Sequence, residues 1–288
     1  MILRAHAKIN LSLAVRGVRP DGYHELRTVF QSLALHDTLR FAEPRAGLAI
    51  TCSDPAVPLG ERNLVWKAAQ LVWEAAGRSG EPCGRARITK RIPAQGGLGG
   101  GSADAAAALV GWNRLWATGL PAQRLCQLAR ALGADVPFFL HAGTALGLGR
   151  GDDIHPLDDA PSRWVVLVFP PFGVSTPEAF RWWDEDSRRL PASGSRLPAE
   201  PESQAAGEVF NDLEAPVCRR HPELVEIRRT LEGAGAAVAA MTGSGSTVFG
   251  LFETRLAARA ASDRITSTGR RSLVTRTATR LQAGLLAG

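Results

Sequence analysis

The 288-residue chain has only four cysteines and one tyrosine, and it has no long apolar run. The cysteines lie far apart and form no Cys-x-x-Cys pair, which argues against a zinc site or a disulfide framework. We expect them to be buried, reduced thiols. The longest apolar run, residues 105–112, is far shorter than the roughly 18 residues of a membrane-spanning helix. The first residues include no apolar segment typical of a signal peptide, so we expect a cytoplasmic protein with no membrane partner.

Lysine is also scarce: it occurs only at Lys8, Lys67 and Lys90, against 31 arginines. Because arginine is so strongly preferred in this chain, each lysine is a candidate for a place where a compact ammonium group is needed. Chance retention is an equal alternative for Lys67. The net charge is +6, but the arginine pairs are scattered along the chain rather than gathered in one block, so no nucleic-acid partner is expected.

The pattern of the first half predicts long strands and amphipathic helices. Alternating hydrophobicity indicates strands over 2–15 and 26–41, joined by a glycine-containing turn. A helix begins at Asn63 and ends near residue 77, and an alanine-rich helix runs from Ser102 to about residue 116. A third helix spans 121–132, and Gly133 ends it.

The second half alternates between strands and helices from residue 164 to the end of the chain. Residues 184–208 contain three prolines and no periodicity, so we expect a loop or insertion there. Blocks of both element types predict an α+β fold with two lobes and mixed sheets. We place the division between residues 1–155 and residues 156–288.

The strongest chemical signal is the segment 93–104, which reads Pro-Ala-Gln-Gly-Gly-Leu-Gly-Gly-Gly-Ser-Ala-Asp. Its five glycines allow positive φ angles, so the backbone can curl its N–H groups inward. The segment follows a predicted strand and enters a predicted helix whose natural N-cap is Ser102. This combination is typical of a phosphate site. It is neither a Walker loop, because no Lys-Ser or Lys-Thr follows, nor a dinucleotide fingerprint.

This segment resembles the phosphate-binding loop of the GHMP kinases (galacto-, homoserine, mevalonate and phosphomevalonate kinases). The segments 7–24 and 132–138, the latter reading Leu-Gly-Ala-Asp-Val-Pro-Phe, resemble one branch of that family. Its members phosphorylate a cytidyl diphosphate derivative of a sugar alcohol in the non-mevalonate isoprenoid pathway. Residues 241–246, Met-Thr-Gly-Ser-Gly-Ser, resemble the third GHMP motif. Ala103, Gln95 and Thr242 depart from the family's usual residues, without removing a catalytic group.

The resemblance implies the two-lobed GHMP kinase fold, with the active site in the cleft between the lobes. It also implies ATP as the co-substrate, with Mg²⁺ carried mainly by phosphate oxygens and water. No carboxylate ligand is assigned, and the Ser102 hydroxyl is a candidate. ATP binding falls on the consecutive residues Pro93, Ala94, Gln95, Gly96, Gly97, Leu98, Gly99, Gly100, Gly101, Ser102 and Ala103.

The resemblance makes Asp135 the general base for the acceptor hydroxyl. Asp135 follows the helix end at Gly133, and Pro137 disfavours a helical conformation at Val136. From its position alone, Asp135 would be a turn residue that accepts hydrogen bonds from the backbone. The family resemblance places Lys8 beside Asp135, where it keeps the carboxylate ionised. A lysine stem lying over the edge of a sheet is the ordinary alternative.

The resemblance also assigns a binding site for the cytidyl group. Tyr23 stacks on the cytosine, His24 contacts the edge of the base as a neutral ring, and Phe180 closes the other face. Phe180 could equally belong to the core beneath its helix. Asn10 lies on the same strand face as Lys8 and can hydrogen-bond the acceptor end of the substrate.

Two other functions compete with this interpretation. One is another GHMP-type small-molecule kinase, mevalonate- or homoserine-like. The other is a nucleic-acid binder, suggested by the positive charge, although the sequence has no clustered cationic face or aromatic RNA motif. Asn63, Lys67 and Lys90 either line the nucleotide pocket or are ordinary surface residues. We expect a monomer or a homodimer.

Overall fold

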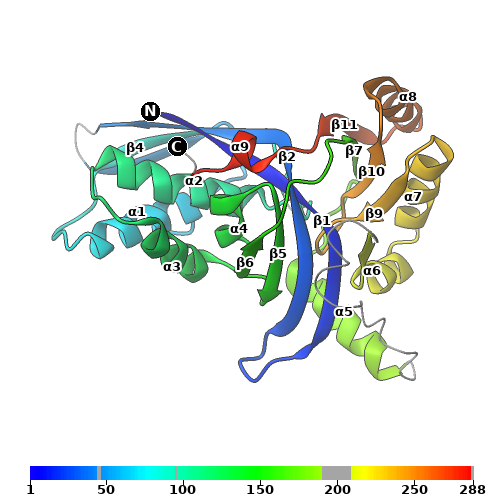
Figure 1. Cartoon of the computed structure of the whole chain (residues 1–288), viewed down its shortest axis with the longest axis horizontal. Coiled ribbons are helices and arrows are strands. Elements are labelled where there is room, and N and C mark those ends of the chain that lie inside the picture. The colour runs from blue at the N-terminus through cyan, green and yellow to red at the C-terminus, as the bar shows by residue number, and fades with distance from the viewer. Residues whose placement is uncertain (44–46, 95, 190–208, 287–288) are drawn as a thin grey trace.

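A computed structural model describes residues 1–43, 47–94, 96–189 and 209–286 of the chain. Two long strands, β1 (Ile2–Val18) and β2 (His24–Ala42), run through the middle of the molecule (Figure 1). They pair antiparallel along almost their whole length, from Ile2 opposite Arg40 to Val18 opposite His24. The predicted pair of long strands is therefore confirmed, and its turn is the tight segment between Val18 and His24.

The first sheet has the strand order β3-β4-β2-β1-β8, and β5 pairs with both β2 and β6. Its further strands are β3 (Leu48–Cys52), β4 (Gly84–Thr89), β5 (Thr144–Gly149), β6 (Asp153–Pro156) and β8 (Phe210–Asn211). The helices packed with it are α1 (Leu64–Ala75), α2 (Gly100–Leu115), α3 (Ala122–Leu132) and α4 (Val136–His141). In Figure 1 these helices lie to the left of the long strands.

Helix α2 lies at the centre of this lobe. Four successive alanines at 105–108 are fully buried, and their small side chains let α2 pack closely against its neighbours. At Gly111 the packing leaves no room for a side chain, because a Cβ there would lie 2.4 Å from Cζ of Phe41. Trp112, one residue further along, is also fully buried and contacts Phe41 edge to face.

The second sheet has the order β11-β7-β10-β9, with every neighbouring pair antiparallel. Its strands are β7 (Trp164–Phe169), β9 (Val238–Met241), β10 (Val248–Phe252) and β11 (Arg271–Arg276). The remaining helices of the described chain are α5 (Thr176–Arg189), α6 (Glu214–Arg220), α7 (Glu223–Gly233), α8 (Arg255–Thr266) and α9 (Arg280–Ala283). Helices α7 and α8 pack on this sheet, at the right of Figure 1. The α+β prediction is thus confirmed.

A shared apolar cluster joins the two lobes. Ile9 and Leu33 from the first sheet and Leu98 from the glycine loop pack against Leu167 and Phe249 of the second sheet, and all five are fully buried or nearly so. The chain also returns from the second lobe to the first sheet at two places in the described residues. Strand β8 returns to pair in parallel with β1, and Thr277 forms a bridge with Leu33.

Three local predictions are wrong. Helix α2 begins at Gly100 rather than Ser102, because Gly99 adopts the left-handed conformation (φ 71°) and acts as the N-cap. Val136 is helical, since Pro137 lies in the first turn of α4, where its missing N–H costs no hydrogen bond. Residues 184–189 are the last turns of α5 and not a loop; the rest of the predicted loop, 190–208, lies outside the described residues.

The four cysteines are free and half-buried, rather than buried as expected. In the part of the chain that the structure describes, no helix is both long enough and apolar enough to cross a membrane.

Gly111→Ala should destabilise the protein by about 1–3 kcal/mol, because the added methyl group overlaps the ring of Phe41. The control is Gly233→Ala at the end of α7, where a Cβ would have no atom within 4 Å. That substitution should stabilise the protein by up to about 1 kcal/mol, because alanine has the higher helix propensity. Urea unfolding measures both changes. A Gly111→Ala variant more stable than the wild type would contradict the packing of α2.

Candidate active site

A cavity of about 810 Å³ lies where the two lobes meet. Both glycine segments contribute to it, the first through residues 96–101 and the second through Gly243 and Ser244. The predicted site residues that line it are Lys8, Asn10, Pro93, Ala94, Gly96, Gly97, Leu98, Gly99, Gly100, Gly101, Ser102, Asp135 and Phe180. Ala103 is instead buried inside α2, and Gln95 lies outside the described residues. Three residues were expected either to line the nucleotide pocket or to be ordinary surface residues. Of these, Asn63 and Lys90 line the cavity, whereas Lys67 is exposed.

Among the described residues, the first glycine loop places backbone N–H groups that have no intrahelical partner against the cavity. The first intrahelical hydrogen bond of α2 runs from Ala103 N to Gly99 O at 2.8 Å. The N–H groups of residues 100–102 precede that bond, so they are the free amides of a helix N-terminus. All three residues line the cavity. This arrangement suits a polyanion, because the amides and the helix dipole both favour negative charge.

The two glycine loops touch each other where no side chain fits. Gly97 has a φ of 72°, and a Cβ there would lie 2.3 Å from the carbonyl oxygen of Thr242. The second loop is held in place by Asn211 of β8, whose Nδ2 donates hydrogen bonds to Met241 O at 3.0 Å and to Gly243 O at 2.8 Å. Asn211 was not predicted, because it lies 32 residues before Gly243 and its partner is a backbone carbonyl.

Lys8 and Asp135 come together in the cavity, with Lys8 Nζ 3.7 Å from Asp135 Oδ2. Lys8 is only 3% exposed, and its Nζ also donates to Asn10 Oδ1 at 2.6 Å. Burial lowers the pKa of the Lys8 ammonium, and the Asp135 carboxylate opposes that shift. The Asp135 side chain is 38% exposed, so its carboxylate remains accessible from the cavity.

Asn10 hydrogen-bonds Lys8 and residues of both lobes. Its Oδ1 accepts from Lys8 and, at 3.3 Å, from the Thr242 hydroxyl of the second glycine loop. Its Nδ2 donates to Thr28 Oγ1 on β2 at 2.7 Å. Because these contacts employ both ends of the amide, Asn10 holds the Lys8 ammonium in one position.

Tyr23 and His24 lie beside the cavity and not among its lining residues. The guanidinium of Arg150, which does line it, lies 5.0 Å from the centre of the Tyr23 ring. The His24 ring stacks on Phe180, with centroids 4.4 Å apart and planes inclined by 18°. Both residues therefore contact the cavity wall through a neighbour.

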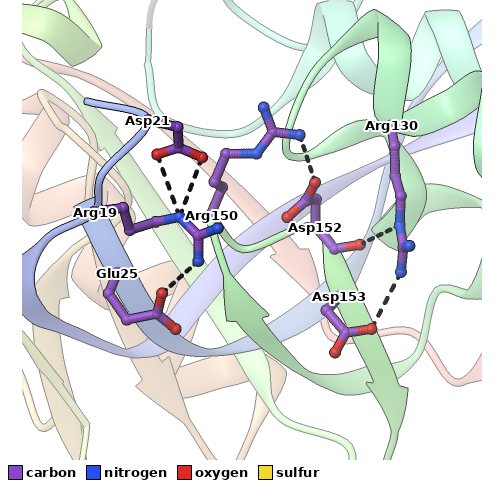
Figure 2. A network of polar contacts seen from close by, with 7 residues as sticks. All are labelled: Arg19, Asp21, Glu25, Arg130, Arg150, Asp152 and Asp153. Carbon is purple, nitrogen blue, oxygen red and sulfur yellow. Dashed lines mark hydrogen bonds and ion pairs between the residues drawn. The ribbon is translucent and has the colours of Figure 1, made fainter. Parts of the chain in front are cut away.

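Ion pairs fix the turns at this end of the cavity (Figure 2). Arg150 donates to Asp152 Oδ2 at 2.6 Å, and Arg130 donates to the backbone oxygen of Asp152 at 3.2 Å. On the β1–β2 turn, Arg19 pairs with Glu25 at 2.6 Å and with Asp21 at 3.3 Å. Arg150 thus lies across the Tyr23 ring while its own position is fixed by Asp152.

A buried charge cluster lies behind the first glycine loop. Lys90 Nζ donates to Asp104 Oδ2 at 2.7 Å and to Asp37 Oδ2 at 2.5 Å. Burial disfavours the Lys90 ammonium, but Asp104 and Asp37 outweigh burial and raise its pKa. Burial raises the pKa of the Asp104 carboxyl to about 7, although Lys90 opposes that shift. Two carboxylates share one ammonium, so one of them retains its proton more readily.

The described residues contain no group of three or more His, Cys, Asp or Glu side chains placed to hold a metal ion. The donors that face the cavity near α2 include amides, the Ser102 hydroxyl and the Lys90 ammonium, whose charge is shared with the Asp104 carboxyl of α2. Such donors suit phosphate oxygens, which can themselves carry a cation, better than a bare cation.

Two protein-family models match the chain. The GHMP kinases N terminal domain matches residues 63–143, and the GHMP kinases C terminal model matches residues 200–271. A solved mevalonate kinase has a TM-score of 0.74 at 12% identity, covering 97% of this chain and 99% of that one. This last similarity concerns the fold alone. The fold and the two glycine loops thus define a small-molecule kinase of the GHMP class.

Similarities to two further proteins identify the family within this class. The chain is 43% identical over 284 residues to the 4-diphosphocytidyl-2-C-methyl-D-erythritol kinase of Moorella thermoacetica, which covers 96% of this chain and 99% of the relative. The crystal structure of a 4-(cytidine 5'-diphospho)-2C-methyl-D-erythritol kinase matches with a TM-score of 0.80 at 38% identity, over 96% of this chain and 99% of that one. The chain belongs to the 4-diphosphocytidyl-2-C-methyl-D-erythritol kinase family.

Asp104 should make the stability of the protein depend on pH. Its pKa is about 7 in the folded state and about 3.9 when unfolded, so the folded state binds the extra proton between these values. The stability that this group contributes is therefore complete below the unfolded pKa and is lost as pH rises to about 7, by up to about 1.4 kcal/mol per pH unit.

Asp104→Asn removes this proton uptake. Its free energy of unfolding, relative to wild type, should therefore increase between pH 5 and pH 7 and then level off. Urea unfolding at each pH measures the difference, and Asp263→Asn, at an exposed position on α8, controls for the loss of one charge. A difference that stays constant with pH would show that Asp104 does not titrate in this range.

Proposed function

We propose that this chain transfers the γ-phosphoryl group of ATP to the 2-hydroxyl of 4-diphosphocytidyl-2-C-methyl-D-erythritol. The observation that carries the proposal is the placement of Lys8 and Asp135 in one cavity with the free amides of α2. The identity to the relative from Moorella thermoacetica supports the substrate, because it extends over both lobes. The reaction belongs to the non-mevalonate isoprenoid pathway.

The ATP phosphates would lie on the first glycine loop, in contact with the N–H groups of residues 100–102. Phosphoryl transfer depends chiefly on positioning and on neutralising charge. Amides fixed at a helix N-terminus provide both without reorganising during the reaction. Asn63 and Lys90, which line the same cavity, would contribute to the nucleotide pocket.

Mg²⁺ would reach the site bound to ATP and would neutralise part of the phosphate charge. The Ser102 hydroxyl, in the first turn of α2, is the protein group placed to contact it. The remaining ligands would be phosphate oxygens and water.

Asp135 would accept the proton of the acceptor hydroxyl as that oxygen attacks the γ-phosphorus. Lys8 would have two tasks at this point: it would provide the positive charge beside the Asp135 carboxylate, and it would stabilise the negative charge that develops on the attacking oxygen. Asn10 fixes the Lys8 ammonium for both tasks, and the same amide lies close to where the acceptor end of the substrate would bind.

The cytidyl group would lie at the end of the cavity formed by Phe180 and Arg150. There, Tyr23 and Phe180 would cover the faces of the base, and His24 would contact its edge. Tyr23 is 55% exposed, which leaves much of its ring free to stack on a ligand. The division at residue 155, the cytoplasmic location and a monomeric or homodimeric state stay predictions from the sequence.

A panel of acceptors tests the substrate. With ATP and Mg²⁺, the cytidyl-methylerythritol diphosphate should be phosphorylated with a kcat/KM at least about 100-fold above that for mevalonate or homoserine, because only the former fills the base site. Turnover of mevalonate or homoserine at the higher rate would favour the other GHMP kinases. Binding of generic RNA that weakens with salt, without any ATP turnover, would favour the nucleic-acid binder.

Lys8→Met and Asp135→Asn should each lower kcat by about 10²–10⁴-fold, because each removes a group that acts on the acceptor oxygen. The dissociation constant of ATP should change by less than about threefold, since the amides that hold the phosphates remain. Steady-state kinetics and calorimetric titration with an ATP analogue measure the two quantities. Lys67→Met and Asp263→Asn are the matched controls, because both positions are exposed and away from the cavity. Full activity in either catalytic variant would falsify the assigned pair.

A further inference from the structure

Helix α5 holds His24 with three side chains from one face. Phe180, Trp183 and Asp184 follow the i, i+3, i+4 spacing that places residues together on a helix. Phe180 stacks flat on the imidazole at 4.4 Å, and Trp183 meets it edge-on at 5.8 Å. Asp184 Oδ1 lies 2.9 Å from His24 Nε2. The His24 side chain is 12% exposed as a result.

The Asp184 contact fixes where the imidazole carries its proton. An ionised carboxylate can only accept hydrogen bonds, so Nε2 of His24 must be the donor. In the neutral ring the other nitrogen, Nδ1, is then an acceptor. Within the described residues, His24 Nδ1 has no hydrogen-bond partner. A neutral His24 ring with this contact therefore offers one lone pair to a ligand.

The contact also joins two segments that are distant in the sequence. His24 begins β2 at the turn between the two long strands, whereas Asp184 belongs to α5, 160 residues later. Phe180 lines the cavity, and the His24 ring stacks on it. A change in the orientation of His24 would therefore change the aromatic surface that Phe180 presents to the cavity.

We infer that Asp184 is a positioning and specificity residue for the nucleobase: it holds His24 flat against Phe180 in the Nε2–H tautomer, so that Nδ1 accepts from the amino group of a cytosine. This inference rests on the proposed function, which places the cytidyl group at this end of the cavity. Cytosine carries an amino donor where uracil carries a carbonyl acceptor. A lone pair on His24 therefore favours the first base and repels the second.

Asp184→Asn tests the inference, because an amide can donate to Nε2 as well as accept from it and no longer dictates the tautomer. The KM for the cytidyl substrate should rise about 5- to 50-fold, with kcat and the KM for ATP within twofold of wild type. The preference for the cytidyl substrate over its uridyl analogue should fall by a similar factor. Asp184→Glu, which keeps the carboxylate, should recover part of the loss.

The matched control is Glu185→Gln, which removes a carboxylate from the same turn of α5 that pairs with Arg220 and not with His24. It should leave the KM of the cytidyl substrate unchanged. His24→Ala combined with Asp184→Asn completes a double-mutant cycle. If Asp184 acts through His24, the second substitution should add less than twofold to the first.

Nitrogen-15 NMR of histidine-labelled protein reads the tautomer directly and needs no substrate. The chain has six histidines, and the signal lost in His24→Ala identifies the one of interest. Wild type should show the Nε2–H form, and Asp184→Asn should show a mixture of both forms. An Nδ1–H tautomer in the wild type, or kinetics of Asp184→Asn equal to those of wild type, would overturn the inference. Absence of any turnover of the cytidyl substrate by wild type would instead overturn the proposed function, while the NMR result would still decide the tautomer.

Discussion

The active site depends on the close approach of two backbone loops, one from each lobe. At Gly97 the carbonyl oxygen of Thr242 occupies the space where a side chain would begin. One residue further along the loop, Leu98 O accepts a hydrogen bond from the backbone N–H of Lys8 at 3.1 Å. This bond sets the position of the Lys8 strand relative to the loop. The glycines thus have two separate uses: some place their amides at the cavity, and Gly97 lets the lobes meet.

Two largely buried lysines, Lys8 and Lys90, lie on either side of the first glycine loop, and different partners compensate their charges. In the cavity, the Lys8 ammonium has one partly exposed carboxylate, Asp135, and one neutral amide, Asn10. That carboxylate therefore remains accessible to a ligand in the cavity. Behind the loop, Lys90 lies between two carboxylates that are almost completely buried. This second cluster lies at the first turns of α2 and helps to fix the loop, because Lys90 joins Asp104 of α2 to Asp37 of β2, and Asp37 also accepts from the backbone N–H of Ile92 just before the loop.

Much of the fold follows from local sequence signals. The strands before and after the β1–β2 turn, the N-cap at Asn63 and the helix end at Gly133 were all predicted, because each depends on neighbouring residues. The start of α2 was not, since the tertiary position of Gly99 outweighs the capping preference of Ser102. The residues of the candidate site were likewise predicted only in part. Motif residues could be named in advance, whereas Asn211, Asp184 and the Lys90 cluster act through partners that no local pattern reveals.

The interlacing of the two lobes has a consequence for synthesis of the protein. Strand β8 belongs to the sheet of the first lobe, and Asn211 within it organises the second glycine loop. The bridge from Thr277 to Leu33 adds a late segment to an early strand. A nascent chain can therefore bury its alanine-rich helix early, yet it has no complete phosphotransfer centre until almost the whole polypeptide has left the ribosome. A chain truncated within the second lobe therefore lacks part of the junction between the two glycine loops.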